Sequence, residues 1–141
     1  MTSTPVAPGL GATADPVILP TVPPMSVADV LDRQDGVYWV VKDANSVFLW
    51  VNQNFADLVG MSKSELIGHQ DSRAEHVAHD KEVMASGKPL LNFHETIAVP
   101  TKDGGMVNVD IVTQKGLLRA LGSDEIIGIT VCFSLKDPVD D

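Results

Sequence analysis

Apolar and polar side chains alternate along several short stretches of this chain, which is the pattern of strands that bury one face. In MVNVDIVTQKGLL, Val107, Val109 and Ile111 alternate with Asn108 and Asp110. The stretches GVYWVVKD, VFLWV, LLNFHETIAV and IIGITVCFS also have strand character. Three polar segments, ANS, DGG and GSDE, supply turn chemistry. The pattern therefore predicts two strands, a long intervening segment and then three strands.

The intervening segment carries the start and stop signals of short helices. Asn52 is a favourable helix cap, and Gly60 suits the end of the helix that it opens. Ser62 and Glu65 have the spacing of a capping box, and Gly68 ends that piece. Helices of this length are not stable alone, so we expect packing against the rest of the domain to hold them.

A longer helix is predicted to follow. Ser72 and Glu75 repeat the capping-box spacing at the start of RAEHVAHDKEVMAS, which stops at Gly87. Ahead of the first strand, Ser26 is expected to cap one more helix, whose apolar residues share one face. Two strands, a helical crossover and three strands indicate an α+β fold with an antiparallel sheet.

Composition divides the chain into three parts. Residues 1–24 hold six of the nine prolines and a single charged side chain, Asp15, so we expect a disordered tail there. The folded domain is expected over residues 25–136, and residues 137–141 form an acidic C-terminal end. We expect neither a secretory signal nor a membrane span, because no apolar run approaches the roughly 18 residues that a span needs.

Charge and cysteine content limit the function classes. The net charge of −9 argues against direct nucleic-acid binding, because phosphate contacts need a basic face. The single cysteine, Cys132, rules out an internal disulfide and a cysteine-based zinc cluster. We expect a cytoplasmic protein with no metal and no membrane partner. No serine has a nucleophile–base signature, so we expect no catalytic residues and no enzyme activity.

Six segments in this order resemble the PAS domain family. They are VKD at 41–43, WVNQNFADLVG at 50–60, SKSELIG at 62–68, HDKEVMASGKP at 79–89, TKDGG at 101–105 and IIGITV at 126–131. The resemblance spans roughly residues 36–135 and looks like the PAS sensory domains of bacterial signalling and transcription regulators. It implies a five-stranded antiparallel sheet of order 2-1-5-4-3, with the helical crossover between strands 2 and 3 and an N-terminal helix.

The resemblance also implies a cavity between the sheet and the helices, where many members bind a small molecule. In this chain we expect Phe55 to be core, and the small, mixed face of the last strand to form a wall of the cavity. The expected pocket residues are Val40, Phe48, Phe55, Leu58, Asp71, Val77, Asp80, Met84, Ile97, Val109, Ile111 and Thr130. Asp80 falls on the helical stripe from Val77 to Met84, and we favour a structural role for its carboxylate over a ligand contact.

The cofactors known from the family fit this sequence poorly. Flavin photosensors carry a reactive cysteine just after the second short helix, and the matching position here is Asp71, so we expect no flavin. Haem needs an axial ligand, usually a histidine on the long helix. His76 and His79 lie on that helix, but we expect both to be solvated or otherwise satisfied. A haem-binding gas sensor therefore remains an alternative, while the favoured interpretation has no cofactor.

The last strand also suggests an interface. Alternation places Ile127, Ile129, Val131 and Phe133 on one face, which we expect to be the outer face of the sheet. The helix at 26–34 is expected to cover this apolar patch in its own chain or in a partner, and the family often forms dimers in this way. The expected homodimer interface comprises Val27, Val30, Leu31, Trp39, Ile129 and Val131.

These observations together predict a PAS sensory or interaction domain. It would bind a small ligand or a protein partner and change the arrangement of a homodimer. That change would reach an output domain or a partner signalling protein. Two alternatives stay open, a haem-binding gas sensor and a pure dimerisation module with a filled core.

Overall fold

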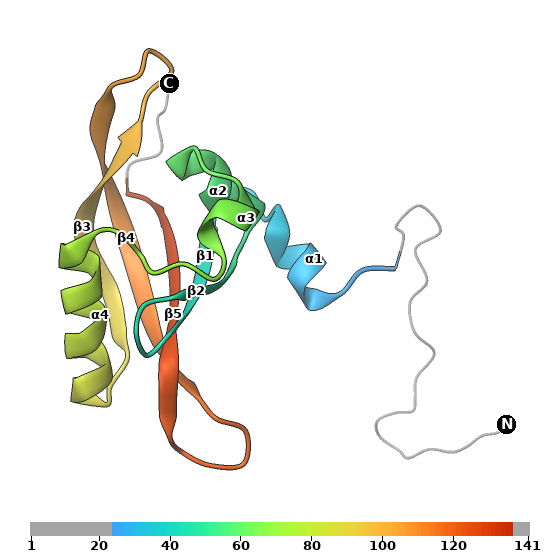
Figure 1. Ribbon diagram of the computed structural model, residues 1–141, viewed down its shortest axis with the longest axis vertical. Coiled ribbons are helices and arrows are strands. Elements are labelled where there is room, and N and C mark those ends of the chain that lie inside the picture. Colours follow the sequence, from blue (N-terminus) through green and yellow to red (C-terminus); the bar gives the residue numbers. More distant parts are fainter. Residues whose placement is uncertain (1–23, 137–141) are drawn as a thin grey trace, which may run out of the picture.

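The structure is a computed structural model that describes residues 24–136. Five antiparallel strands form one sheet in the order β2-β1-β5-β4-β3 (Figure 1). The strands are β1 Tyr38–Asp43, β2 Phe48–Val51, β3 Leu90–Pro100, β4 Met106–Arg119 and β5 Ile126–Leu135. The helices are α1 Val27–Asp32, α2 Gln53–Val59, α3 Lys63–Leu66 and α4 Ala74–Ser86. The predicted α+β fold, its strand order and its helical crossover are confirmed.

The short helices begin and end where the sequence signals place them. The Asn52 side chain accepts a hydrogen bond from the backbone N–H of Phe55, and Gly60 ends α2 in the left-handed conformation. Ser62 and Glu65 form the predicted capping box of α3. A glycine suits position 60 because its φ of 70° is unfavourable for a side chain with a Cβ atom.

The start of α4 differs from the prediction. Ser72 does not cap this helix; the cap residue is Arg73, whose side chain makes no capping hydrogen bond. The Asp71 carboxylate instead accepts from the backbone N–H of Arg73 at 3.1 Å. The capping-box prediction at Ser72 was wrong because this segment bends around the Asp71 carboxylate, whose oxygens also bind two cationic side chains.

The two faces of β5 are reversed relative to the prediction. Ile129, Val131 and Phe133 are buried in the core beneath the helices, with exposed fractions of 8% or less. Thr130 lies on the opposite, outer face, because its pairing partner is Val41 rather than the inward-facing Val40. Thr130 is therefore not a pocket residue, and Ile129 and Val131 are not free for a dimer interface. Strict alternation defines two faces, but it does not say which one the helices cover.

The N-terminal helix does not cover the sheet. Val27 and Val30 are 76% and 56% exposed, and α1 extends away from the sheet in Figure 1. The end of α1 is tied instead to α2 and α3, since Asp32 accepts from the backbone N–H of Gln53 and pairs with Lys63. Of the two alternatives for α1, the lid within its own chain is therefore excluded, and the outer face of the sheet has no cover among the described residues.

Two further sequence predictions concern the ends and the membrane. The predicted tail at 1–24 and the acidic end at 137–141 lie outside the described residues, apart from Pro24. Within residues 24–136, none of the helices has the length and apolar character needed to cross a membrane.

Candidate functional site

Three hollows meet between the sheet and the helices. A small inner cavity of about 30 Å³ lies against the inner face of the sheet. A cleft of about 510 Å³ opens between the first turns of α4 and β3. A third hollow, of about 450 Å³, is bordered by α2, α3 and the hairpin of β3 and β4. Arg73 borders all three, so this residue lies at their junction.

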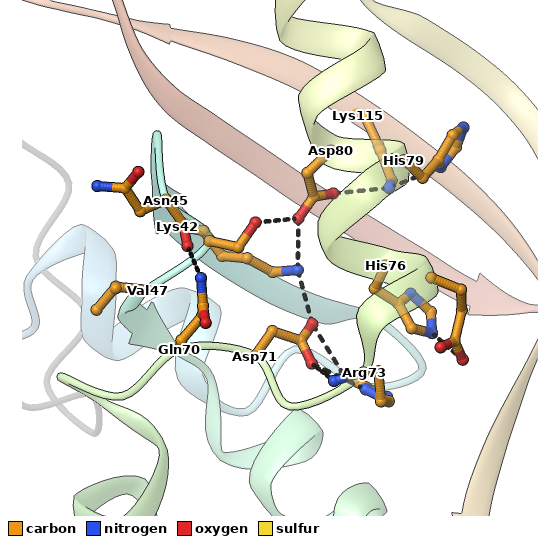
Figure 2. Close-up of polar contacts among 12 residues, drawn as sticks. Lys42, Asn45, Val47, Gln70, Asp71, Arg73, His76, His79, Asp80 and Lys115 are labelled. Carbon is orange, nitrogen blue, oxygen red and sulfur yellow. Dashed lines mark hydrogen bonds and ion pairs between the residues drawn. The ribbon is translucent and has the colours of Figure 1, made fainter.

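A chain of buried ionic groups lies beside the inner cavity, and Figure 2 shows the contacts within it. Lys42, on β1, extends inward with its ammonium 2.9 Å from an Asp71 oxygen and 2.8 Å from an Asp80 oxygen. Lys115, on β4, places its ammonium 2.8 Å from the other Asp80 oxygen. None of these four side chains is more than 6% exposed. The network joins the loop before α4, α4 itself and two strands of the sheet.

Asp80 is the centre of this network. Its carboxylate accepts hydrogen bonds from Lys42, Lys115 and the hydroxyl of Ser46, the last at 3.1 Å. Burial alone would raise the pKa of the Asp80 carboxyl, but the Lys42 and Lys115 ammonium groups lower it below the usual 3.8. The structural role favoured for Asp80 fits these contacts, with two lysines as partners that the sequence analysis did not name.

Asp71 links the network to the junction of the hollows. It accepts from Lys42 on one oxygen and from the Nε atom of Arg73 on the other, at 2.9 and 3.1 Å. Burial would raise the pKa of the Asp71 carboxyl, but the Lys42 ammonium and the Arg73 guanidinium together lower it to about 2. The carboxylate therefore stays ionised over the whole physiological range.

Asp71→Asn should lower the free energy of unfolding, and the size of this loss should depend on pH. A carboxyl whose pKa is lowered in the folded state stabilises the fold above its unfolded pKa of about 3.9, and this stabilisation is lost as the pH falls toward 2. We expect urea unfolding to show a loss of about 2 kcal/mol at pH 7. The difference in free energy of unfolding between wild type and variant should become smaller as the pH falls from 4 to 2. A difference that stays constant down to pH 2 would show that the charge of Asp71 is not responsible.

The two histidines of α4 point toward the hollows. His76 borders the inner cavity, and burial, the Arg73 guanidinium and the Lys42 ammonium together lower its pKa, so the ring is neutral at pH 7. His79 contacts the Lys115 ammonium through its Nδ1 atom at 2.9 Å and lies against the Phe93 ring. Both histidines were expected to be solvated or otherwise satisfied; His79 is satisfied by Lys115, whereas the His76 side chain is only 16% exposed. Within residues 24–136, no three histidine, cysteine or acidic side chains are grouped closely enough to hold a metal ion.

The structure brings together about half of the predicted pocket residues. Val40, Phe55, Ile97 and Ile111 line the inner cavity, and Phe48 and Asp71 line the hollow beside α2 and α3. Leu58 borders a separate surface hollow. Val77, Met84 and Val109 are half-buried but line none of these hollows, and Asp80 is enclosed by its ionic partners.

Asp71 and Asp80 were predicted from the sequence, but the three cations of the site and Glu95 were not. Lys42 and Lys115 are inward-facing residues of their strands, at even spacing from Val40 and Ile111, and this spacing was the available signal. Glu95 lies at an inward position of β3 for the same reason, between Phe93 and Ile97. Arg73 had no signal, because its position depends on the bend of the loop before α4.

Comparisons with known proteins give the same fold. A family model described as PAS fold matches residues 32–110. A structure of VqmA bound to DPO is 26% identical, with a TM-score of 0.61, and the match covers 77% of this chain and 56% of that one. A structure of the Vibrio cholerae VqmA dimer without its target DNA is 25% identical, with a TM-score of 0.62, covering 80% and 54%. This chain thus spans about half the length of the VqmA chains that it matches.

A third structure covers most of its own chain. It is a PAS domain of a protein from Colwellia psychrerythraea, 19% identical with a TM-score of 0.55, and the match covers 77% of this chain and 92% of that one. At this identity the likeness shows the fold alone. A search of curated protein sequences returned no match.

Proposed function

The chain belongs to the PAS fold family, whose model matches more than half of its length, and from this premise we propose that it is a sensory domain for a small ligand. The observation that carries the proposal is the inner cavity beside the ionic network. Its walls are mostly apolar, yet Lys42, Arg73 and Lys115 border it as well. Apolar walls with a few fixed polar groups are typical of sites that recognise one small molecule.

The similarity to VqmA supports a small ligand. VqmA has been solved with DPO bound, and it is one of the matches above 25% identity. VqmA also has a target DNA, so the comparisons do not support the expectation that this protein has no nucleic-acid partner. PAS domains are found in regulators of this kind, so an output domain or a partner signalling protein would receive the signal.

Native mass spectrometry of the purified protein tests the ligand proposal. We expect a second species that is heavier than the chain, and we expect denaturation to release the added mass. A chain that carries no additional mass, and that no metabolite extract stabilises against heat, would support the alternative of a pure dimerisation module with a filled core.

The haem alternative has one observation in its favour, which is that the neutral ring of His76 borders the inner cavity. An absorption spectrum of the purified protein tests it. We expect a colourless protein, because the cavity is far smaller than haem and Arg73 stands beside the histidine. A Soret band that disappears in His76→Ala would favour the gas sensor instead.

We further propose that the outer face of the sheet and α1 form a homodimer interface that moves when the ligand binds. The outer face carries a band of half-buried and largely apolar side chains without cover among the described residues: Trp39, Val41, Trp50, Val112, Thr130 and Cys132. Val27 and Val30 add exposed apolar surface on α1. Uncovered apolar surface of this kind marks interaction sites, and VqmA is a dimer.

Val27→Asp together with Val30→Asp should dissociate this dimer. Both side chains are exposed, so charges at these positions cost little in the folded monomer and become unfavourable only when a partner buries them. We expect light scattering to give a dimer for the intact chain at tens of micromolar and a monomer for the variant. Met61→Asp, at an exposed position beyond α2, is the control and should remain dimeric. A monomeric intact chain would overturn this interface.

A further inference from the structure

Arg73 is only partly used by the protein. Its Nε atom donates to Asp71 at 3.1 Å, while its Nη2 atom lies 3.5 Å from the second Asp71 oxygen, at the limit of a hydrogen bond. Asp71 is itself shared with Lys42. A guanidinium has five N–H donors, so most of those on Arg73 have no partner among the described residues. Arg73 borders the inner cavity and the cleft between α4 and β3.

Glu95 borders the same two hollows as Arg73. One of its carboxylate oxygens accepts a hydrogen bond from the Thr113 hydroxyl at 2.7 Å. Its other oxygen accepts no hydrogen bond from the part of the chain that the structure describes, and no cation there lies within 4.0 Å of the carboxylate. The cleft is thus bordered by the Arg73 guanidinium, whose charge Asp71 neutralises only in part, and by the Glu95 carboxylate, which has no cationic partner among the described residues. Arg73 and Glu95 form no ion pair with each other.

The buried and half-buried charges of the site balance without a ligand, and Glu75, the further acidic residue at the cleft, is 78% exposed. The three cations are Lys42, Arg73 and Lys115, and the three anions are Asp71, Asp80 and Glu95. A ligand with one net charge would leave an excess charge in a largely buried site, which is unfavourable. A neutral ligand with both an anionic and a cationic group would satisfy Arg73 and Glu95 together and keep the balance.

From this geometry we propose that the cleft binds a zwitterion, an α-amino acid with a short apolar side chain, through its carboxylate to Arg73 and its ammonium group to Glu95. The proposal rests on the proposed function, that of a small-ligand sensor. The inner cavity would hold the side chain of the ligand, because it adjoins Arg73 and Glu95. Apolar residues line it: Val40, Ile97, Ile111, Val131 and Phe133. Its volume of about 30 Å³ has room for roughly two water molecules, and hence for a short branched side chain rather than an aromatic one.

The test compares three compounds that differ by one group. L-valine carries both charges, 3-methylbutanoate lacks the amine, and 2-methylpropylamine lacks the carboxylate. We expect isothermal titration calorimetry and thermal shift to detect L-valine, and to show at least about tenfold weaker binding for each of the others, since a charged hydrogen bond is lost. Wild-type protein that binds 3-methylbutanoate as tightly as L-valine, or that does not bind L-valine at millimolar concentration, would overturn the proposal.

Two variants should change the selectivity in opposite directions. Glu95→Gln keeps an acceptor for Thr113 but removes the charge, so it should weaken the binding of L-valine by about tenfold or more. The binding of 3-methylbutanoate should not weaken, because this anion balances the positive charge that the variant site then carries. Arg73→Gln should weaken the binding of L-valine similarly, while the binding of 2-methylpropylamine should not weaken, because this cation balances the negative charge of that variant site. Arg73→Lys, which keeps a cation beside Asp71, is the second variant if Arg73→Gln unfolds. Circular dichroism melting establishes that each variant is folded.

Glu75→Gln is the matched control. Glu75 borders the same cleft, but its side chain is 78% exposed, so its charge is screened by water. We expect L-valine to bind this variant within about twofold of wild type. An equal loss in Glu75→Gln and Glu95→Gln would mean that only the overall charge of the cleft matters, and would contradict the assigned contact. A bound molecule of another class in native mass spectrometry would leave the sensor proposal standing and overturn this one.

Discussion

Asp80→Ala should lower the free energy of unfolding by about 3 to 5 kcal/mol, a large share of the stability of a domain of this size. Asp80 is the only anion that contacts Lys115 among the described residues, and it shares Lys42 with Asp71. Removing its carboxylate leaves a fully buried ammonium group without a counter-charge, and that cost exceeds the loss of the hydrogen bonds themselves. Urea unfolding followed by circular dichroism measures the change.

Two companion variants identify the cause. Glu82→Ala, at an exposed position of the same helix, should change stability by no more than about 0.5 kcal/mol. Asp80→Asn keeps the shape of the side chain but removes the charge, so it should account for most of the loss. A loss under about 1 kcal/mol for Asp80→Ala would show that water reaches the lysines, and that the network is less buried than its exposed fractions indicate.

Phe55→Ala should be about as costly, with an expected loss of about 3 to 5 kcal/mol. The Phe55 ring is 2% exposed and lies edge-on to Phe133 at 6.2 Å, with Phe48 at 6.0 Å on another side. Removing it would open a cavity between α2 and the sheet that the rigid neighbouring strands cannot close.

Leu49→Ala is the control for Phe55, because Leu49 lies on β2 with 47% of its surface exposed. It should change stability by less than about 1 kcal/mol. The same urea titration gives both values. Similar losses in the two variants would mean that α2 is not packed on the sheet as described.

The helix boundaries were predictable because they depend on neighbours in the sequence. Asn52, Ser62 and Ser26 each bind a backbone N–H three residues later, and such contacts need no knowledge of the tertiary fold. Ser72 had the same local signal and failed. There, the Asp71 carboxylate provides the backbone N–H of Arg73 with an acceptor and holds Arg73 at the cap position.

The candidate site was harder to predict because it depends on which face of each strand the helices cover. The sequence predicted Ile129, Val131 and Phe133 of β5 on the outside of the sheet, but these residues form the core. The lysines were overlooked because a lysine in a strand is normally exposed. Lys42 and Lys115 are buried only because Asp80, far away in the sequence, comes between them in the fold.

The Asn52 side chain joins three elements of the domain through hydrogen bonds. Its side-chain nitrogen donates to the carbonyl oxygens of Leu31 and Val37, each at 3.0 Å. Its oxygen accepts from the backbone N–H groups of Trp39 and Phe55. Every hydrogen-bonding group of this one amide is therefore occupied, by the end of α1, the entry to β1 and the first turn of α2. A displacement of α1 relative to α2 would therefore break hydrogen bonds of Asn52, and the N–H that Asn52 caps belongs to Phe55, a residue in the wall of the inner cavity.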